Sequence, residues 1–134
     1  YERVSMFKDA VKMYENMANL SITFVEKIKH YMKGVEVAIR GGDVYGAEDA
    51  MRKAISQANT AQREDIYQQT LTLYKNQADV FEKNMKRGNA VQIYEKLLEM
   101  KLPEFEKNEI REKLRSLYEK LGRRKELYNL GRKT

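Results

Sequence analysis

The sequence predicts an all-α fold of antiparallel helical hairpins that pack as a bundle. Residues with high helix propensity dominate the chain, and its single proline, Pro103, stands at a break between predicted helices. Apolar residues recur at alternating intervals of three and four, the spacing of one helix face, and no segment alternates with a period of two. The connections are short, so consecutive helices should pack antiparallel within a single domain, residues 1–134.

Six helices are expected in order along the chain. The first covers residues 3–40, because its heptad phase survives across Ser21; in the alternative, Ser21 would cap a second helix after a break. The next helix starts after Asp43, a predicted N-cap, and follows an alanine stripe to Ala58. The remaining helices are predicted at residues 61–87, 90–101, 103–121 and 124–131.

Glycines are expected where these helices end. Gly42 and Gly88 should adopt the left-handed conformation that closes a helix, and Gly122 should end the helix before it. The predicted core pairs the stripe of the third helix with that of the first. Its residues are Tyr74, Ala78 and Phe81 against Val25, Ile28 and Met32.

Part of the chain resembles the tetratricopeptide repeat, whose period is 34 residues. Four pairs of residues have this separation: Gly88 and Gly122, Tyr94 and Tyr128, Ile93 and Leu127, and Val80 and Leu114. Residues 42–55 begin with Gly-Asp and carry Ala47, Met51 and Ala54, a layout similar to the turn and second helix of such a repeat. Residues 118–123 look like the end of a repeat's first helix. The resemblance implies tetratricopeptide-like hairpins, above all toward the C-terminal half.

A second resemblance rests on other features of residues 35–89. Gly42 and Asp43 end a helix, an alanine-rich helix follows, and the pair Leu73 and Tyr74 lies on the helix after that. This layout is similar to that of the bacterial flagellin-export chaperone family. It implies an antiparallel bundle with a chaperone role.

The composition argues against an enzyme and against a metalloprotein. The chain has no cysteine, which excludes disulfides, thiolate metal sites and cysteine nucleophiles. The one histidine, His30, lies four residues after Glu26, where the two side chains form an ordinary surface pair on one helical face. We therefore expect no catalytic residue, no metal site and no cofactor.

No run of eighteen apolar residues is present, so no membrane-spanning segment is predicted. The absence of cysteine is compatible with the cytoplasm, which is the location we expect. The chain starts at Tyr1 rather than at Met, as expected of a processed chain or an excised domain.

Two apolar seams near the N-terminus predict a partner-binding surface. One seam begins at Val4, and the other consists of Met6, Met13 and Leu20; together they are wider than one packed neighbour requires. Surfaces rich in Met and Tyr adapt to partner helices and peptides. We therefore predict a non-catalytic protein–protein interaction module, which would be a scaffold, adaptor or chaperone-like protein. Its Met6, Met13 and Leu20 would contact another protein or a second copy of the chain.

The basic excess is confined to the C-terminal end. Residues 1–106 carry 16 basic and 16 acidic side chains, whereas residues 107–134 carry 10 basic and 4 acidic ones, which accounts for the net charge of +6. Such an asymmetry can mark a surface for nucleic acid. Nucleic-acid binding by the C-terminal helices is therefore the alternative function. The basic residues assigned to it are Arg111, Arg115, Arg123, Arg124 and Lys125.

Overall fold

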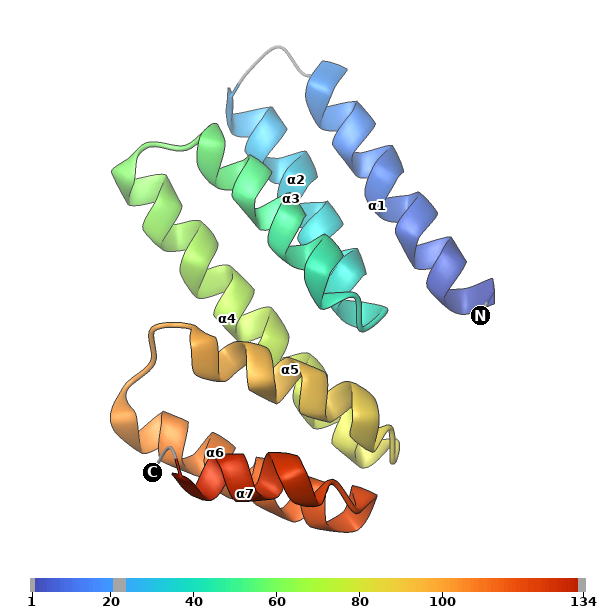
Figure 1. Ribbon diagram of the computed structural model, residues 1–134. Helices are drawn as coiled ribbons and strands as arrows, with labels where there is room; N and C mark the ends of the chain where they lie inside the picture. The colour runs from blue at the N-terminus through green and yellow to red at the C-terminus, as the bar shows by residue number, and fades with distance from the viewer. Residues whose placement is uncertain (1, 21–23, 133–134) are drawn as a thin grey trace. The chain divides into compact units, whose positions relative to one another are not determined.

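The computed structural model describes the backbone of residues 2–20 and 24–132, and the side chains of residues 6–17 and 24–131. Over these residues the secondary structure consists of seven helices and no strand, which confirms the all-α class (Figure 1). The helices are α1 (Glu2–Leu20), α2 (Phe24–Arg40), α3 (Val44–Ser56), α4 (Thr60–Lys83), α5 (Arg87–Glu99), α6 (Glu104–Leu121) and α7 (Arg124–Arg132).

The chain divides into two compact units, Tyr1–Leu73 and Tyr74–Thr134, and the division falls inside α4. Unit 1 contains α1, α2, α3 and the first part of α4, and unit 2 contains the rest of α4 with α5, α6 and α7. In unit 1, α2 packs against both α1 and α3, and α1 also touches α3. In unit 2, α6 packs against both α5 and α7. The predicted single domain stays a prediction.

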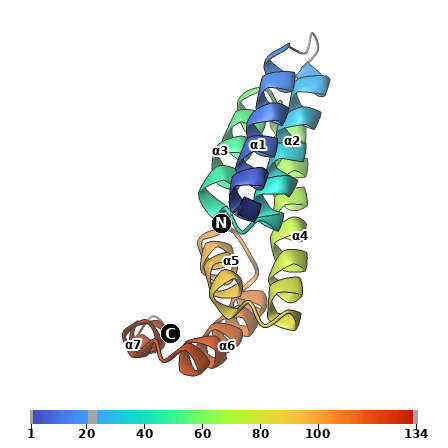
Figure 2. The same cartoon turned by 90° about the vertical axis from the view of Figure 1, so that its right-hand side faces the viewer.

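The predicted continuous helix over residues 3–40 is wrong. α1 ends at Leu20, α2 begins at Phe24, and the two helices run antiparallel side by side (Figures 1 and 2). Both helices turn an apolar face inward, and Val11 of α1 and Val35 of α2 are both buried. Two such faces in succession give the same apolar spacing as one continuous helix. The alternative cap, Ser21, falls outside the described residues.

The core of unit 1 is built around the alanine face of α3. Ala54 belongs to a buried cluster drawn from α2, α3, the loop after α3, and α4; its members are Tyr31, Ala54, Ala58 and Ile66. Ile28 and Met32 of α2 pack against this cluster, whereas Val25 is 65% exposed. The predicted core position of Val25 is therefore wrong, because this residue lies on the outward side of the first turn of α2. Tyr74, Ala78 and Phe81 are buried, and their predicted packing against Ile28 and Met32 stays a prediction.

Three helices end in the same type of turn, in which a left-handed residue follows the helix. Gly42 (φ 75°), Met85 (φ 60°) and Gly122 (φ 70°) occupy this position. In each turn the next N–H donates to the carbonyl five residues back: Asp43 to Ala38 (2.9 Å), Lys86 to Phe81 (2.8 Å) and Arg123 to Tyr118 (2.9 Å). The predicted left-handed conformation is confirmed for Gly42, and Gly122 ends α6 as predicted. The prediction is wrong for Gly88, which lies inside α5 because the chain has already turned at Met85.

The turn between α2 and α3 is completed by Asp43, as predicted. Its Oδ1 accepts a hydrogen bond from the N–H of Gly46 at 2.9 Å, which caps α3. The side chain lies so close to Gly46 that a Cβ on this glycine would collide with the Asp43 carboxylate. The sequence Gly-Asp-x-x-Gly therefore forms one structural unit that turns the chain from α2 into α3.

Two tyrosine hydroxyls connect the helices of unit 2. Tyr94 of α5 donates to Glu82 of α4 (3.0 Å), and Tyr118 of α6 donates to Glu95 of α5 (2.7 Å). Burial, reinforced by these carboxylates, raises the pKa of both tyrosines well above the usual range. Tyr128, which lies 34 residues after Tyr94, is by contrast 66% exposed. The 34-residue spacing alone does not mark equivalent environments, and the tetratricopeptide likeness stays a prediction.

Candidate partner-binding surfaces

A groove of about 780 Å³ lies between α2 and the first part of α4, entirely within unit 1. α2 and α4 both flank α3, and the core cluster of unit 1 joins all three helices. The groove has one wall from each flanking helix. Its lining residues on α2 are Val25, Ile28, Lys29, Met32, Lys33 and Glu36, and those on α4 are Gln62, Asp65, Ile66, Gln68, Gln69, Thr72 and Leu73.

The deepest part of the groove is apolar. Ile66 is 2% exposed, and Ile28 and Met32 are partly buried against the same cluster. Val25 extends this apolar strip one turn toward the start of α2, where it is open to solvent. Val25, Ile28 and Met32 follow the three-and-four spacing of a helix face, so a continuous apolar strip runs along the α2 wall.

The upper walls carry charges of both signs. On α2, Lys33 pairs with Glu36 at 3.6 Å, and Lys29 is exposed. On α4, Asp65 accepts a hydrogen bond from the side-chain amide of Gln69 at 2.8 Å. The groove therefore combines an apolar floor with a charge-balanced polar rim, the composition typical of protein-binding surfaces.

The predicted partner-binding seam of α1 is exposed where the structure describes it. Met6 is 71% and Met13 is 53% exposed, and Met17 is exposed beside them. The side chain of Leu20 lies outside the described residues. Val11, from the other seam, is buried, so over the described side chains of α1 Val11 faces the core while Met6 and Met13 face solvent. Binding through Met6, Met13 and Leu20 stays a prediction.

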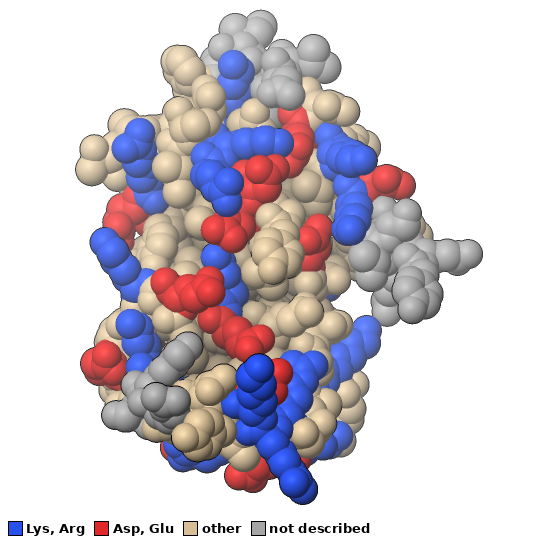
Figure 3. Space-filling model, in the orientation of Figure 1, with Lys and Arg blue, Asp and Glu red and all other residues tan. Residues whose placement is uncertain are grey.

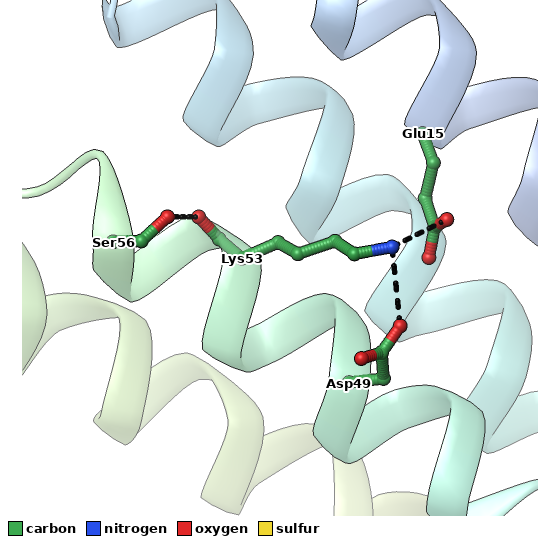
Figure 4. Close-up of polar contacts among 4 residues, drawn as sticks. All are labelled: Glu15, Asp49, Lys53 and Ser56. Atoms are coloured by element: carbon green, nitrogen blue, oxygen red, sulfur yellow. Dashed lines mark hydrogen bonds and ion pairs between the residues drawn. The ribbon is translucent and has the colours of Figure 1, made fainter.

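A polar contact between helices fixes which side of α1 faces α3. The ammonium of Lys53 on α3 donates to Glu15 of α1 at 2.8 Å and lies 3.2 Å from Asp49 (Figure 4). The hydrogen bond to Glu15 raises the pKa of Lys53. Glu15 and Met13 are two positions apart and so lie on different sides of the helix. The contact between Glu15 and Lys53 therefore leaves Met13 facing outward.

The five predicted basic residues do not share one environment. Arg111 donates to Asn108 at 2.7 Å and lies 3.4 Å from Glu104, and Arg115 pairs with Glu112 at 2.6 Å. Arg123 is half-buried, whereas Arg124 and Lys125 at the start of α7 are exposed. The predicted set thus consists of two arginines that pair with carboxylates on α6, the half-buried Arg123, and two cations that face solvent. Lys and Arg side chains gather over α6 and α7 in Figure 3.

The residues that the structure describes carry neither a metal-binding cluster nor a membrane-spanning helix. Within them, no three His, Asp or Glu side chains gather where they could hold a metal ion. No helix in the same ranges is long and apolar enough to cross a membrane. His30 and Glu26 both lie on α2, as predicted, with His30 half-buried and Glu26 exposed.

The groove is the feature that sequence reasoning missed. Val25, Ile28 and Met32 were assigned to the core because their spacing cannot distinguish a fully packed face from one wall of an open groove. The signal available was the polar character of the neighbouring positions Lys29 and Lys33, which interrupt what would otherwise be a buried face.

Comparison with models of known protein families, with curated proteins and with solved structures gives no match to this chain.

Proposed function

We propose that this protein is a non-catalytic interaction module that holds an amphipathic helix of a partner protein in the groove between α2 and α4. The observation that carries the proposal is the groove itself, with its apolar floor and polar rim. The partner would bury an apolar face on Ile28, Met32 and Ile66 and keep its polar face toward solvent. A scaffold, adaptor or chaperone-like role in the cytoplasm belongs to the same proposal.

The dimensions of the groove favour a helix as the occupant. Its α2 wall extends from Val25 to Glu36, about 16 Å or three helical turns at 1.5 Å per residue. A helix of that length presents apolar anchors at positions i, i+3 or i+4, and i+7, which match a strip of three or four apolar side chains. Met32 at the centre has three rotatable bonds, so it can adapt its shape to the anchor that enters.

The charges on the rim favour a partner helix that also carries both signs. Lys29 belongs to the α2 wall and Asp65 to the α4 wall. A bound helix would place an acidic flank beside α2 and a basic flank beside α4. Because these charges balance, the apolar contact should dominate the affinity, which should therefore change little with salt.

The test uses a photo-cross-linking amino acid in place of Gln69, an exposed residue on the α4 wall of the groove. We expect adducts with a partner segment whose apolar residues have helical spacing. The substitution Val25→Asp places a charge on the apolar strip and should reduce the adduct yield about tenfold or more, since an apolar contact would be replaced by a desolvated carboxylate.

Phe105→Asp is the matched control, because Phe105 is also 65% exposed and is also the second residue of its helix. It should leave the yield from Gln69 unchanged. Equal loss in both variants, or no loss in Val25→Asp, would show that the groove is not the binding site. Loss in a Met6→Gln, Met13→Gln double variant alone would instead assign partner binding to the exposed seam of α1.

The likeness to the tetratricopeptide repeat is also a proposal. The α2–α3 hairpin supports it, because its Gly42-Asp43 turn leads into a helix whose Ala47 and Ala54 are fully buried, as in the turn and second helix of a tetratricopeptide repeat. The differing surroundings of Tyr94 and Tyr128 speak against a regular repeat in unit 2.

A further inference from the structure

The positive charge of this protein belongs to one of its two units. Unit 1 carries 10 basic and 10 acidic residues, whereas unit 2 carries 16 basic and 10 acidic ones. The imbalance is strongest at the end of the chain, where residues 120–134 contain six basic residues and one acidic residue. An interaction driven by charge would therefore involve unit 2, and it would be separate from the groove of unit 1.

Several cations of unit 2 have an anionic or aromatic partner, whereas a group of exposed cations lies at the turn between α6 and α7. Arg111 and Arg115 each pair with a carboxylate of α6, so a second anion would have to compete with that partner. Lys113 stands over the ring of Tyr94, 5.6 Å from its centre. In contrast, Lys120, Arg124 and Lys125 are exposed within six consecutive residues. We call these three residues the turn cations.

An exposed aromatic ring stands beside the turn cations. Tyr128 is 66% exposed and follows Arg124 by four residues on α7, so the two side chains share one face of that helix. The opposite face of α7 is turned inward, with Leu130 buried and Leu127 half-buried. α7 therefore presents charge and a ring to solvent, and its aliphatic face is already occupied.

We propose that the turn cations and Tyr128 form a binding surface for single-stranded nucleic acid. Phosphates would contact Lys120, Arg124 and Lys125, and a base would stack on Tyr128, which is the combination that single-strand binding requires. A bilayer fits less well, because an interfacial helix must insert its apolar face and that of α7 is packed. An acidic peptide would use the cations and leave the ring without a role.

The test measures binding of a fluorescent oligothymidylate of about 15 nucleotides to the complete chain at about 50 and 200 mM salt. With three phosphates engaged, the slope of log affinity against log salt should be about −2, from 0.7 per phosphate on single strands. Arg124→Gln with Lys125→Gln should weaken binding about tenfold at the lower salt concentration and reduce the slope by about 1.4.

Two comparisons make the test specific. Arg111→Gln with Arg115→Gln removes the same charge from side chains that are already paired, and it should change the affinity by less than about twofold. Tyr128→Ala should weaken binding about fivefold or more, whereas Tyr128→Phe, which keeps the ring, should bind as the wild type does. Circular dichroism of each variant confirms that the helices are intact.

The proposal would be overturned by any of three results. Absence of oligothymidylate binding at the lower salt concentration would exclude the site. Equal losses in the two double variants would show a non-specific attraction to net charge. Equal affinity for polyglutamate, with Tyr128→Ala unchanged, would assign the surface to acidic polypeptides instead. None of these results would bear on Gln69 cross-linking, so the groove in unit 1 is judged separately.

Discussion

Met85 has a backbone conformation that residues with a side chain seldom adopt. Its φ of 60° is shared by Gly42 and Gly122 in the equivalent turns, where glycine has no Cβ to crowd the carbonyl. The side chain of Met85 is 70% exposed, so burial does little to offset the backbone strain.

Met85→Gly should therefore stabilise the protein. We expect the free energy of unfolding to rise by about 1 kcal/mol, since relief of the left-handed strain outweighs the extra freedom of glycine in the unfolded chain. Urea unfolding monitored by circular dichroism measures the change. Gly122→Ala is the reverse change, because it places a side chain at a left-handed position. It should lower the free energy of unfolding by about 1 kcal/mol. A Met85→Gly protein less stable than the wild type would contradict the assigned turn.

The hydroxyl of Tyr94 makes the stability of unit 2 sensitive to pH in the alkaline range. Burial and the bond to Glu82 raise the pKa of Tyr94 in the folded chain, whereas the unfolded chain releases this proton near the ordinary value of 10.0. A group whose pKa is raised by folding stabilises fully below its unfolded pKa, and this stabilisation is lost as pH rises toward the folded pKa. The pKa of Tyr118 is also raised, so its contribution to stability is lost in the same direction of pH.

Tyr94→Phe tests this linkage. At about pH 7 the variant should be about 1 kcal/mol less stable than the wild type, because one partly buried hydrogen bond is missing. Above pH 10 the wild type should lose stability more steeply than the variant, so the difference between them narrows. Urea unfolding across this range measures both curves, and parallel curves would refute the assignment.

At the scale of elements, the packing of α1 on α2 depends on a glycine. A Cβ built on Gly41 would stand 2.8 Å from the ring of Phe7 on α1, closer than carbon atoms can approach. Gly88, in the first turn of α5, has only the guanidinium of Arg123 nearby, 4.0 Å from the same construction.

The same substitution should thus have opposite effects at the two glycines. Gly41→Ala should destabilise the protein by about 1–3 kcal/mol, because Phe7 must move with its helix. Gly88→Ala should be neutral or stabilising by up to about 1 kcal/mol, because alanine suits a helix and finds space there. Thermal unfolding of both variants gives the comparison, and Phe7→Ala should reduce the penalty at Gly41. Similar penalties at both sites would refute this account.

Most helices could be located from the sequence because their ends carry local signals. Gly42, Pro103 and Gly122 mark breaks that the structure confirms within a residue or two. A break after Leu20 was only the alternative to one long helix, because a heptad phase looks the same in one long helix and in two helices that share a core. The turn at Met85 was missed because methionine gives no signal for a left-handed backbone.

The candidate surfaces were predictable only in part. Exposure of Met6 and Met13 followed from two apolar seams on a helix at the edge of the fold. The groove was not predictable, because Ile28 and Ile66 are far apart in sequence and only tertiary packing places α2 beside α4. The basic residues were visible as a composition, but pairing of Arg115 with Glu112 depends on side-chain conformations that spacing does not determine.

For the whole molecule, the two units are connected through one continuous helix. α4 has 24 residues, from Thr60 to Lys83, and the division between the units falls after Leu73. Loss of one unit would leave part of α4 without its packing, so the two units should unfold together.

A proline within α4 should uncouple them. Asn76→Pro, at an exposed position, removes a backbone hydrogen bond and costs about 3 kcal/mol in a helix interior. We expect one thermal transition in the wild type and two in the Asn76→Pro variant, measured by circular dichroism. Thr60→Pro, at the first residue of α4, is the control and should leave one transition. A single transition in the Asn76→Pro variant would contradict this coupling.

The shared helix also determines where this chain can be divided by proteolysis or by gene rearrangement. A cut between Leu73 and Tyr74 would split α4 into pieces of 14 and 10 residues. Helices of that length are marginal in water without tertiary partners. Each fragment would retain most of its own core, but its piece of α4 would be frayed at the cut. Neither unit can therefore be transferred to another protein as an independent domain. Any viable transfer of the groove or of the basic surface to another protein must take α4 whole.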